Sequence, residues 1–115
     1  MALSKNQLDE IIAGFVSRLS REIHVEQVIL FGSYAHGNPK GYSDIDLAII
    51  SDWFRGKKRI ESMQYLSRMA AGYNTLIEAI PFTTDEYREL DRRTFLSSIV
   101  KNGKPYLPDS LDLTE

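Results

Sequence analysis

Apolar residues along the chain follow two spacings, one typical of helices and the other of strands. Over residues 5–21 they recur three and four positions apart, which predicts an amphipathic helix. Ser4 and Gln7 fit a capping box at the start of this helix. The same spacing predicts a second long helix over residues 55–71 and two short helices over residues 84–90 and 94–101.

Short runs of branched and aromatic residues predict three buried strands, over residues 25–31, 43–50 and 75–80. Gly32 should end the first of these strands and Pro81 the third. The order is therefore helix, strand, strand, helix, strand and two helices. This order predicts an α/β (α+β) fold, in which helices pack on a small mixed β-sheet.

The predicted helix over residues 55–71 carries a basic start and an apolar face. Arg55, Lys57, Lys58 and Arg59 place four positive charges where the helix is expected to begin. They could contact a triphosphate, RNA or an acidic partner, or they could form a solvated helix end. The face expected to be buried consists of Ile60, Met63, Leu66, Met69 and Ala70.

Composition limits the kind of protein this can be. With 115 residues, 43% of them hydrophobic, the chain suits one domain over residues 1–115, with a loosely held tail from 105 to 115. The absence of cysteine excludes disulfides and a cysteine nucleophile, and His24 and His36 are too far apart for a zinc-type pair. Apolar runs of at most four residues exclude a membrane span. The N-terminal residues show no apolar core of a signal peptide, so we expect a cytoplasmic protein. The net charge of -2 argues against direct binding of nucleic acid.

Asp44 and Asp46 are the strongest candidates for chemistry. They stand two residues apart on a predicted strand, so their side chains should lie on one face, roughly 6–7 Å apart. Like charges at the start of a buried strand repel each other, and a bound divalent cation such as Mg²⁺ would offset this repulsion. The alternative is that both carboxylates are simply solvated at the end of the strand.

Two further features could complete a nucleotide site around this pair. Gly32 and Ser33 follow a strand directly, where backbone amides and a hydroxyl can hold phosphate, although a lone Gly-Ser is usually just a turn. Glu78 lies within an apolar strand, where a carboxylate is costly to bury unless it is paired or binds metal. If that strand lies beside the strand of the two aspartates, three acids converge and can hold two metal ions. If it is an edge strand, Glu78 faces solvent.

These residues resemble the signature of the minimal nucleotidyltransferases, part of the DNA-polymerase-β-like nucleotidyltransferase superfamily. The family pattern reads Gly-Ser-x-Ala-Arg-Gly, five residues, then Ser-Asp-x-Asp-Leu, and residues 32–47 match every fixed position but one. The exception is His36, which stands where the family usually has Arg. His carries less charge and fewer donors than Arg at neutral pH, which would weaken its contact with phosphate or mark a subfamily with little activity.

The resemblance implies a polymerase-β palm-like nucleotidyltransferase fold and a set of site residues. Two Mg²⁺ ions would be held by three acids, and the nucleoside triphosphate would contact the residues of the glycine-serine bend. The acids are Asp44, Asp46 and Glu78, which are also the implied catalytic residues, and the implied nucleotide-binding residues are Gly32, Ser33 and His36.

The resemblance also implies an activity and a partner. A hydroxyl on an acceptor would attack the α-phosphate of a nucleoside triphosphate, with ATP as the expected donor, and pyrophosphate would leave. Stand-alone members are similar to antitoxins paired with a HEPN-domain toxin, some of which adenylylate a toxin tyrosine. A HEPN-domain protein or a second copy of the chain is therefore the expected partner. An inactive fold that neutralises a partner by covering it is the alternative, and transfer to a small molecule ranks last.

Overall fold

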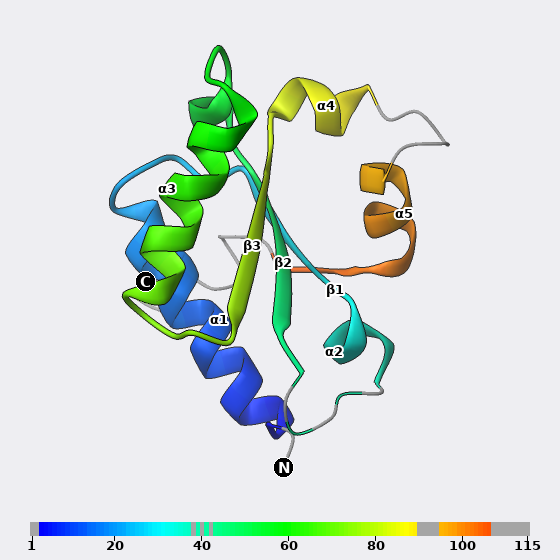
Figure 1. Ribbon diagram of the computed structural model, residues 1–115. Coiled ribbons are helices and arrows are strands. Elements are labelled where there is room, and N and C mark those ends of the chain that lie inside the picture. Colours follow the sequence, from blue (N-terminus) through cyan, green and yellow to red (C-terminus); the bar gives the residue numbers. More distant parts are fainter. Residues whose placement is uncertain (1–2, 38, 40, 42, 90–94, 107–115) are drawn as a thin grey trace, which may run out of the picture.

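A four-stranded mixed sheet organises the fold (Figure 1). β1 (Gln27–Phe31) pairs antiparallel with β2 (Ile45–Ile50), and β2 pairs parallel with β3 (Ile77–Phe82). β4 (Lys104–Pro105) pairs antiparallel with the other side of β1, so the strand order is β3-β2-β1-β4. The expected small mixed sheet is therefore confirmed. This computed structural model describes residues 3–37, 39, 41, 43–89 and 95–106.

Helices cover the two faces of the sheet unequally (Figure 1). α1 (Lys5–Ser20) and α3 (Arg59–Ala71) pack on one face and share the larger core with it. α5 (Phe95–Asn102) packs on the opposite face over a smaller cluster. Within the described part of the chain, no helix has the length and apolar character needed to cross a membrane. The short helices are α2 (Ser33–His36), the 3-10 turn η1 (Asp52–Phe54) and α4 (Thr84–Arg88).

The face covered by α5 presents three rows of side chains across β1, β2 and β3. The strand register sets these rows, because every second residue of a strand points to the same face. Two rows are mostly apolar, and the third carries two acids at the end where β2 and β3 begin. The rows are Gln27–Ile50–Phe82, Ile29–Ala48–Ile80 and Phe31–Asp46–Glu78.

α1 follows its prediction closely because its signals are local. The Ser4 hydroxyl accepts a hydrogen bond from the Gln7 amide at 3.1 Å, and Gln7 Oε1 accepts one from the Ser4 amide at 2.9 Å. This is the expected capping box. The buried residues of the helix are Leu8, Ile12, Phe15, Val16 and Leu19.

The prediction of a helix from residue 55 is wrong at its start, since α3 begins at Arg59. The Ser51 hydroxyl accepts from the Trp53 amide at 3.0 Å and closes the 3-10 turn η1. Arg55 then pairs with Asp52 at 2.9 Å and with Asp85 at 3.2 Å. These contacts hold the segment before residue 59 out of the helix, so most of the basic cluster lies in a turn.

The buried face of α3 also differs from the expected one. Ile60 and Met63 are 58% and 41% exposed, although the spacing placed them in the core. Leu66 and Ala70 are buried as expected, and Ser62, four residues before Leu66, is buried as well. Where the helix meets the sheet decides which face is covered, and the apolar spacing alone does not contain that information.

β3 runs through Pro81, where the sequence pattern placed the strand's end. The amides of Ile45 and Ser51 donate to the carbonyls of Leu76 and Phe82, so the even-numbered residues of β3 bond to β2. Pro81 therefore faces the outer edge of the sheet. A proline is tolerated there because the amide hydrogen that it lacks has no partner strand.

Residues 104–106 belong to the fold, contrary to the expectation of a loose tail from residue 105. Lys104 and Pro105 form β4 against β1. The Tyr106 hydroxyl donates to Asp9 Oδ1 on α1 at 2.8 Å. Burial, followed by this hydrogen bond, raises the pKa of Tyr106 to about 12. The remainder of the predicted tail, residues 107–115, lies outside the described residues.

Candidate active site

Three acidic side chains meet where β2 and β3 begin. Asp46 is the second residue of β2 and Glu78 the second of β3, and the strand register pairs them directly. Asp44 precedes β2 by one residue rather than lying within the strand as expected. One carboxylate oxygen of each residue lies within 4.8 Å of those of the other two. The structure thus brings together the three acids that the sequence indicated.

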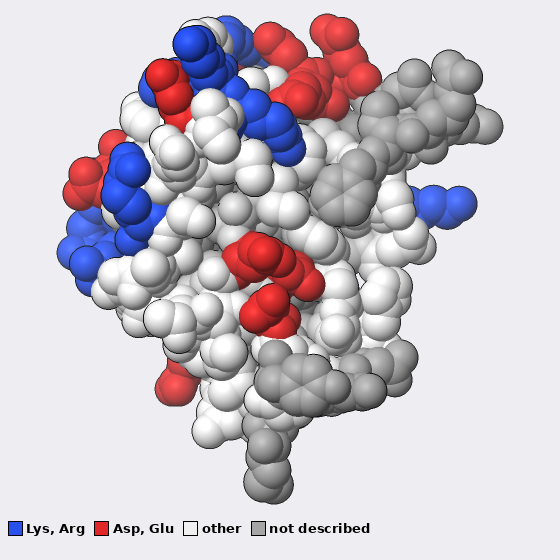
Figure 2. Space-filling view, viewed as in Figure 1, with Lys and Arg blue, Asp and Glu red and all other residues white. Residues whose placement is uncertain are grey.

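Glu78 combines the two alternatives that the sequence left open. β3 is an edge strand and Glu78 is exposed, yet Glu78 also lies beside Asp46. Asp44 is exposed as well, whereas Asp46 is half-buried. Figure 2 shows an acidic patch over β2 and β3, bordered by uncharged residues where the structure describes them. A cation could reach such a cluster from solvent.

The ionised form of Asp46 is disfavoured in this cluster. Burial is the largest cause, and a hydrogen bond with Glu78 and the negative charges of Glu78 and Asp44 add to it. Together they raise the pKa of Asp46 from 3.8 to about 7. A bound divalent cation would favour the ionised carboxylate and so lower this pKa.

Gly32 packs directly against Asp46. β1 ends at Phe31, the register partner of Asp46, and the chain turns at Gly32 with a φ of +76°. A Cβ atom at Gly32 would lie 3.1 Å from Cγ of Asp46 and would collide with its Oδ2. Glycine is therefore required here both for the backbone conformation and for the space beside the carboxylate.

Ser33 and His36 are the first and last residues of α2. The expected helical turn after Gly32 is confirmed, with the amides of Ala35 and His36 donating to the Gly32 carbonyl at 3.1 and 3.2 Å. Ser33 is half-buried and follows Gly32 directly, so it adjoins the acidic cluster. His36 is exposed at the other end of α2.

Two apolar side chains beside the acids were missed by the sequence reasoning. Phe31 is the register partner of Asp46, and Ile80 follows Glu78 by two residues on the same face. Both are half-buried at the margin of the smaller core. The two-residue alternation of the strands is the signal that could have found them, had the register been known. They offer an apolar surface next to the acids.

The donor set of the cluster fits a hard divalent cation. All three residues offer carboxylate oxygens, with no imidazole or thiolate in the group. Oxygen ligands of this kind suit Mg²⁺, which is commonly bound by one or two carboxylates together with substrate phosphates. The bend at Gly32 lies directly beside the same cluster, with the Asp46 carboxylate in the position that a Cβ atom would take. The residues therefore fit the metal that the family resemblance implies.

Fold and site together define a small α/β domain of the nucleotidyltransferase kind, and comparison with known proteins agrees. Residues 9–108 match the model of the nucleotidyltransferase domain family, so the chain belongs to that family. A search of curated protein sequences found no significant match.

Solved structures show the same fold. A candidate nucleotidyltransferase from Sulfolobus solfataricus aligns with a TM-score of 0.60 at 20% identity, over 79% of this chain and 86% of that chain. A toxin–antitoxin structure with AMP-PNP aligns with a TM-score of 0.50 at 25% identity, over 81% of this chain and 70% of that chain. The expected nucleotidyltransferase fold is thereby confirmed.

Proposed function

We propose that this protein is a magnesium-dependent nucleotidyltransferase that moves AMP from ATP to a hydroxyl group on a partner protein. Membership of the nucleotidyltransferase domain family supports transfer of a nucleotidyl group. The observation that carries the proposal is the meeting of Asp44, Asp46 and Glu78 beside the bend at Gly32. A cluster of carboxylates, one of which packs against the glycine of a strand-to-helix bend, suits a metal-bound phosphate chain.

The proposal gives each site residue a role. Asp44, Asp46 and Glu78 would hold Mg²⁺, with oxygen ligands enough for two ions. When bound, the metal stabilises the negative charge that develops on the reacting phosphates. Gly32 lets the triphosphate approach the backbone, and the Ser33 hydroxyl donates a hydrogen bond to it.

The reaction itself is an in-line displacement at phosphorus. The acceptor's hydroxyl oxygen forms a bond to the α-phosphorus of ATP, the bond from that phosphorus to the pyrophosphate oxygen breaks, and the acceptor proton leaves to water. The chain contributes chiefly by holding the two reactants in line and by supplying electrostatic stabilisation.

We further infer that the acceptor is a HEPN-domain toxin and that this chain is its antitoxin. Support comes from the similarity to the toxin–antitoxin structure with AMP-PNP. The location of the acids is consistent with an acceptor on another protein, because Asp44 and Glu78 are exposed at a sheet face that a partner could cover. A second copy of the chain is the other surface that could supply the acceptor.

Transfer of a labelled nucleotide tests the proposal. The chain is incubated with Mg²⁺, ATP labelled at its α-phosphate and the protein encoded by the neighbouring gene, and we expect label on that protein. The double variant Asp44→Asn/Asp46→Asn should transfer none. Glu10→Gln, which removes an exposed carboxylate on α1, should transfer as much as the unaltered chain. Absence of transfer, or equal transfer by the double variant, would refute the proposal.

A catalytically inactive antitoxin is the second candidate, and His36 favours it. The residue stands where the family usually has an arginine and is exposed at the end of α2. On this alternative the chain neutralises its partner by binding alone, so Asp46→Asn should leave both complex formation and neutralisation intact. If Asp46→Asn abolishes neutralisation while the complex still forms, binding alone is insufficient.

A further inference from the structure

The proposed reaction defines the side from which the acceptor approaches. Gly32 and Ser33 follow β1 directly, and the proposed function places the triphosphate against them. In an in-line displacement, the attacking oxygen lies opposite the leaving pyrophosphate. Because β1 and β3 flank β2 on opposite sides, the acceptor hydroxyl then comes from the side of β3. We therefore expect the acceptor protein to lie over β3.

The face of β3 that carries Glu78 continues into an apolar stretch. Glu78, Ile80 and Phe82 point to this face, since they are two residues apart on one strand. Ile80 is half-buried, and Phe82 lies roughly 13 Å from Glu78 along the strand. In Figure 2 the acidic patch and the basic side chains over the start of α3 are visible on the same side of the molecule. The surface between them is uncharged where the structure describes it.

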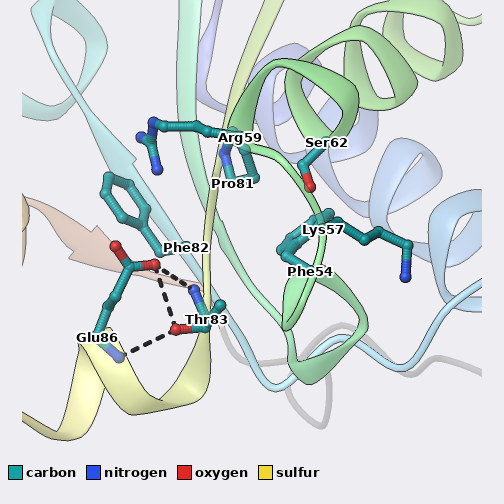
Figure 3. Close-up of a pocket in the computed structure, with 8 residues that line it drawn as sticks. All are labelled: Phe54, Lys57, Arg59, Ser62, Pro81, Phe82, Thr83 and Glu86. Atoms are coloured by element: carbon teal, nitrogen blue, oxygen red, sulfur yellow. Dashed lines mark hydrogen bonds between the residues drawn. The ribbon is translucent and has the colours of Figure 1, made fainter.

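Arg59 brings a positive charge from α3 to the far end of this stretch. Its guanidinium lies over the Phe82 ring, with 5.1 Å between Cζ and the ring centroid. Figure 3 shows the side chain extending from α3 past Pro81 to that ring, beside a cavity of about 200 Å³. A guanidinium stacked on an aromatic ring keeps its N–H groups available at the edge, where a carboxylate can accept two of them.

This guanidinium has no acidic partner in the part of the chain that the structure describes. Arg59 is exposed, and none of the described carboxylates lies within ion-pair distance of it. Glu86 lines the same cavity, but its Oε1 accepts from the Thr83 amide at 2.8 Å and from the Thr83 hydroxyl at 3.2 Å. Lys57, a neighbouring cation, donates to the Trp53 carbonyl at 2.7 Å. Arg59 is therefore held by an aromatic ring on the face of the acids and is available to a carboxylate of another molecule.

We propose that Arg59 recognises the acceptor by pairing with a carboxylate of the partner protein, roughly 10–15 Å from the hydroxyl that receives AMP. This inference rests on the proposed function and adds a residue that selects the partner without taking part in the transfer. The separation follows from the spacing of Glu78 and Phe82 on β3. In an extended acceptor segment, it corresponds to a Glu or Asp about four residues from the modified side chain. Ile80 lies between the two contacts and offers an apolar surface to the segment.

Peptide binding in the absence of ATP tests the recognition apart from any transfer. The ¹⁵N-labelled full chain is titrated by NMR with acetyl-Tyr-Gly-Ser-Gly-Glu-amide and with the reversed sequence, which covers both chain directions. We expect saturable shifts centred on residues 59 and 78–82 with one of the two. Replacing Glu by Gln in that peptide should weaken binding about 3–10-fold, because the charge that pairs with the guanidinium is lost. Arg59→Gln should remove this preference for Glu, while Arg68→Gln, which alters an exposed arginine on the same helix, should retain it.

The kinetics of transfer identify the substrate that Arg59 contacts. With the protein encoded by the neighbouring gene as acceptor, Arg59→Gln should raise the KM for that protein about 3–10-fold. The kcat and the KM for ATP should stay unchanged, because the arginine contacts neither the reacting atoms nor the nucleotide. Arg59→Lys keeps the charge but loses the paired donors, so it should restore part of the affinity. A rise in the KM for ATP instead would assign the arginine to the nucleotide and overturn the proposal.

Failure of this proposal and failure of the proposed function give different results. A chain that prefers the Glu peptide through Arg59 but transfers no nucleotide would refute the transfer and support Arg59 as a residue that binds the partner. Recognition by Arg59 is overturned if neither peptide gives saturable shifts or if the Glu and Gln peptides bind equally. It is also overturned if Arg59→Gln leaves the KM for the acceptor protein unchanged, although the transfer activity itself would then stand.

Discussion

Replacing Asp46 with Asn should stabilise the metal-free protein at neutral and alkaline pH. In the folded chain the pKa of Asp46 is raised from 3.8 to about 7, mainly by burial and then by Glu78 and Asp44. Between these two pH values the folded state holds a proton that the unfolded state has released. The free energy of unfolding contributed by this group therefore falls as pH rises from about 4 to about 7. Asn carries no charge and avoids this loss.

The size of the effect follows from the shift in pKa. A shift of about three units corresponds to an upper limit of about 4 kcal/mol at 1.36 kcal/mol per unit. Asp46 is only half-buried, so solvent screens the charge and we expect about 1–2 kcal/mol above pH 7. For a domain of this size that is a rise in Tm of roughly 5–10 °C.

Thermal unfolding in EDTA between pH 4 and pH 8.5 measures this difference. The curves of the unaltered chain and Asp46→Asn should converge near pH 4 and separate progressively toward pH 8, with the variant the more stable. Glu10→Gln should run parallel to the unaltered chain, because this exposed carboxylate lies on α1 and outside the acidic cluster. A difference that is constant across pH, or a variant that is less stable at pH 8, would refute the reasoning.

Addition of Mg²⁺ should reverse the order of the two proteins. A ligand that binds only the folded state contributes about 2.7 kcal/mol at 100 times its dissociation constant. The unaltered chain should gain this stability, increasingly so as pH rises through about 7, because protons compete with the metal for Asp46. Asp46→Asn should gain little.

Three further changes have effects that the structure defines. Gly32→Ala should lower the free energy of unfolding, measured in urea, by about 1–3 kcal/mol. The residue has a φ of +76°, and the added Cβ would collide with the Asp46 carboxylate. Unchanged stability would contradict this expectation. Ser62→Ala should stabilise the chain by about 1 kcal/mol in the same assay, with the exposed Ser67→Ala as control, and a loss of stability would show that the hydroxyl has a partner after all. Tyr106→Phe should lower the free energy of unfolding by about 1 kcal/mol through loss of its hydrogen bond to Asp9, while leaving nucleotidyl transfer unchanged. A matching loss of transfer would show that the contact between Tyr106 and α1 contributes to the function of the site.

Local signals in the sequence were enough to predict α1 and the outline of the site. The capping box at Ser4 depends on residues three apart, and the bend at Gly32 and the pair Asp44 and Asp46 lie within 15 residues of one another. Short-range patterns of this kind carry their own geometry, because backbone conformation and side-chain direction repeat over a few residues. Family resemblance then connected these residues to one chemistry.

Long-range contacts accounted for the errors. Arg55 pairs with Asp85 on α4 in the turn before α3 begins at Arg59, and β4 exists only because residues 104 and 105 reach β1. Neither contact leaves a local pattern. The burial of Ser62 could not be predicted from the apolar spacing either, since the buried face of α3 is set by the sheet that it meets.

The sequence by itself determined the location of β1 and β2, the glycine bend and the two aspartates, all of which depend on neighbouring residues. Only the tertiary structure decided whether Glu78 would join them, because that depends on which strand lies beside β2 and in what register. A shift of one residue would turn Glu78 to the opposite face of the sheet. The parallel pairing of β3 with β2 converts three separate acids into one cluster, and the same contact raises the pKa of Asp46.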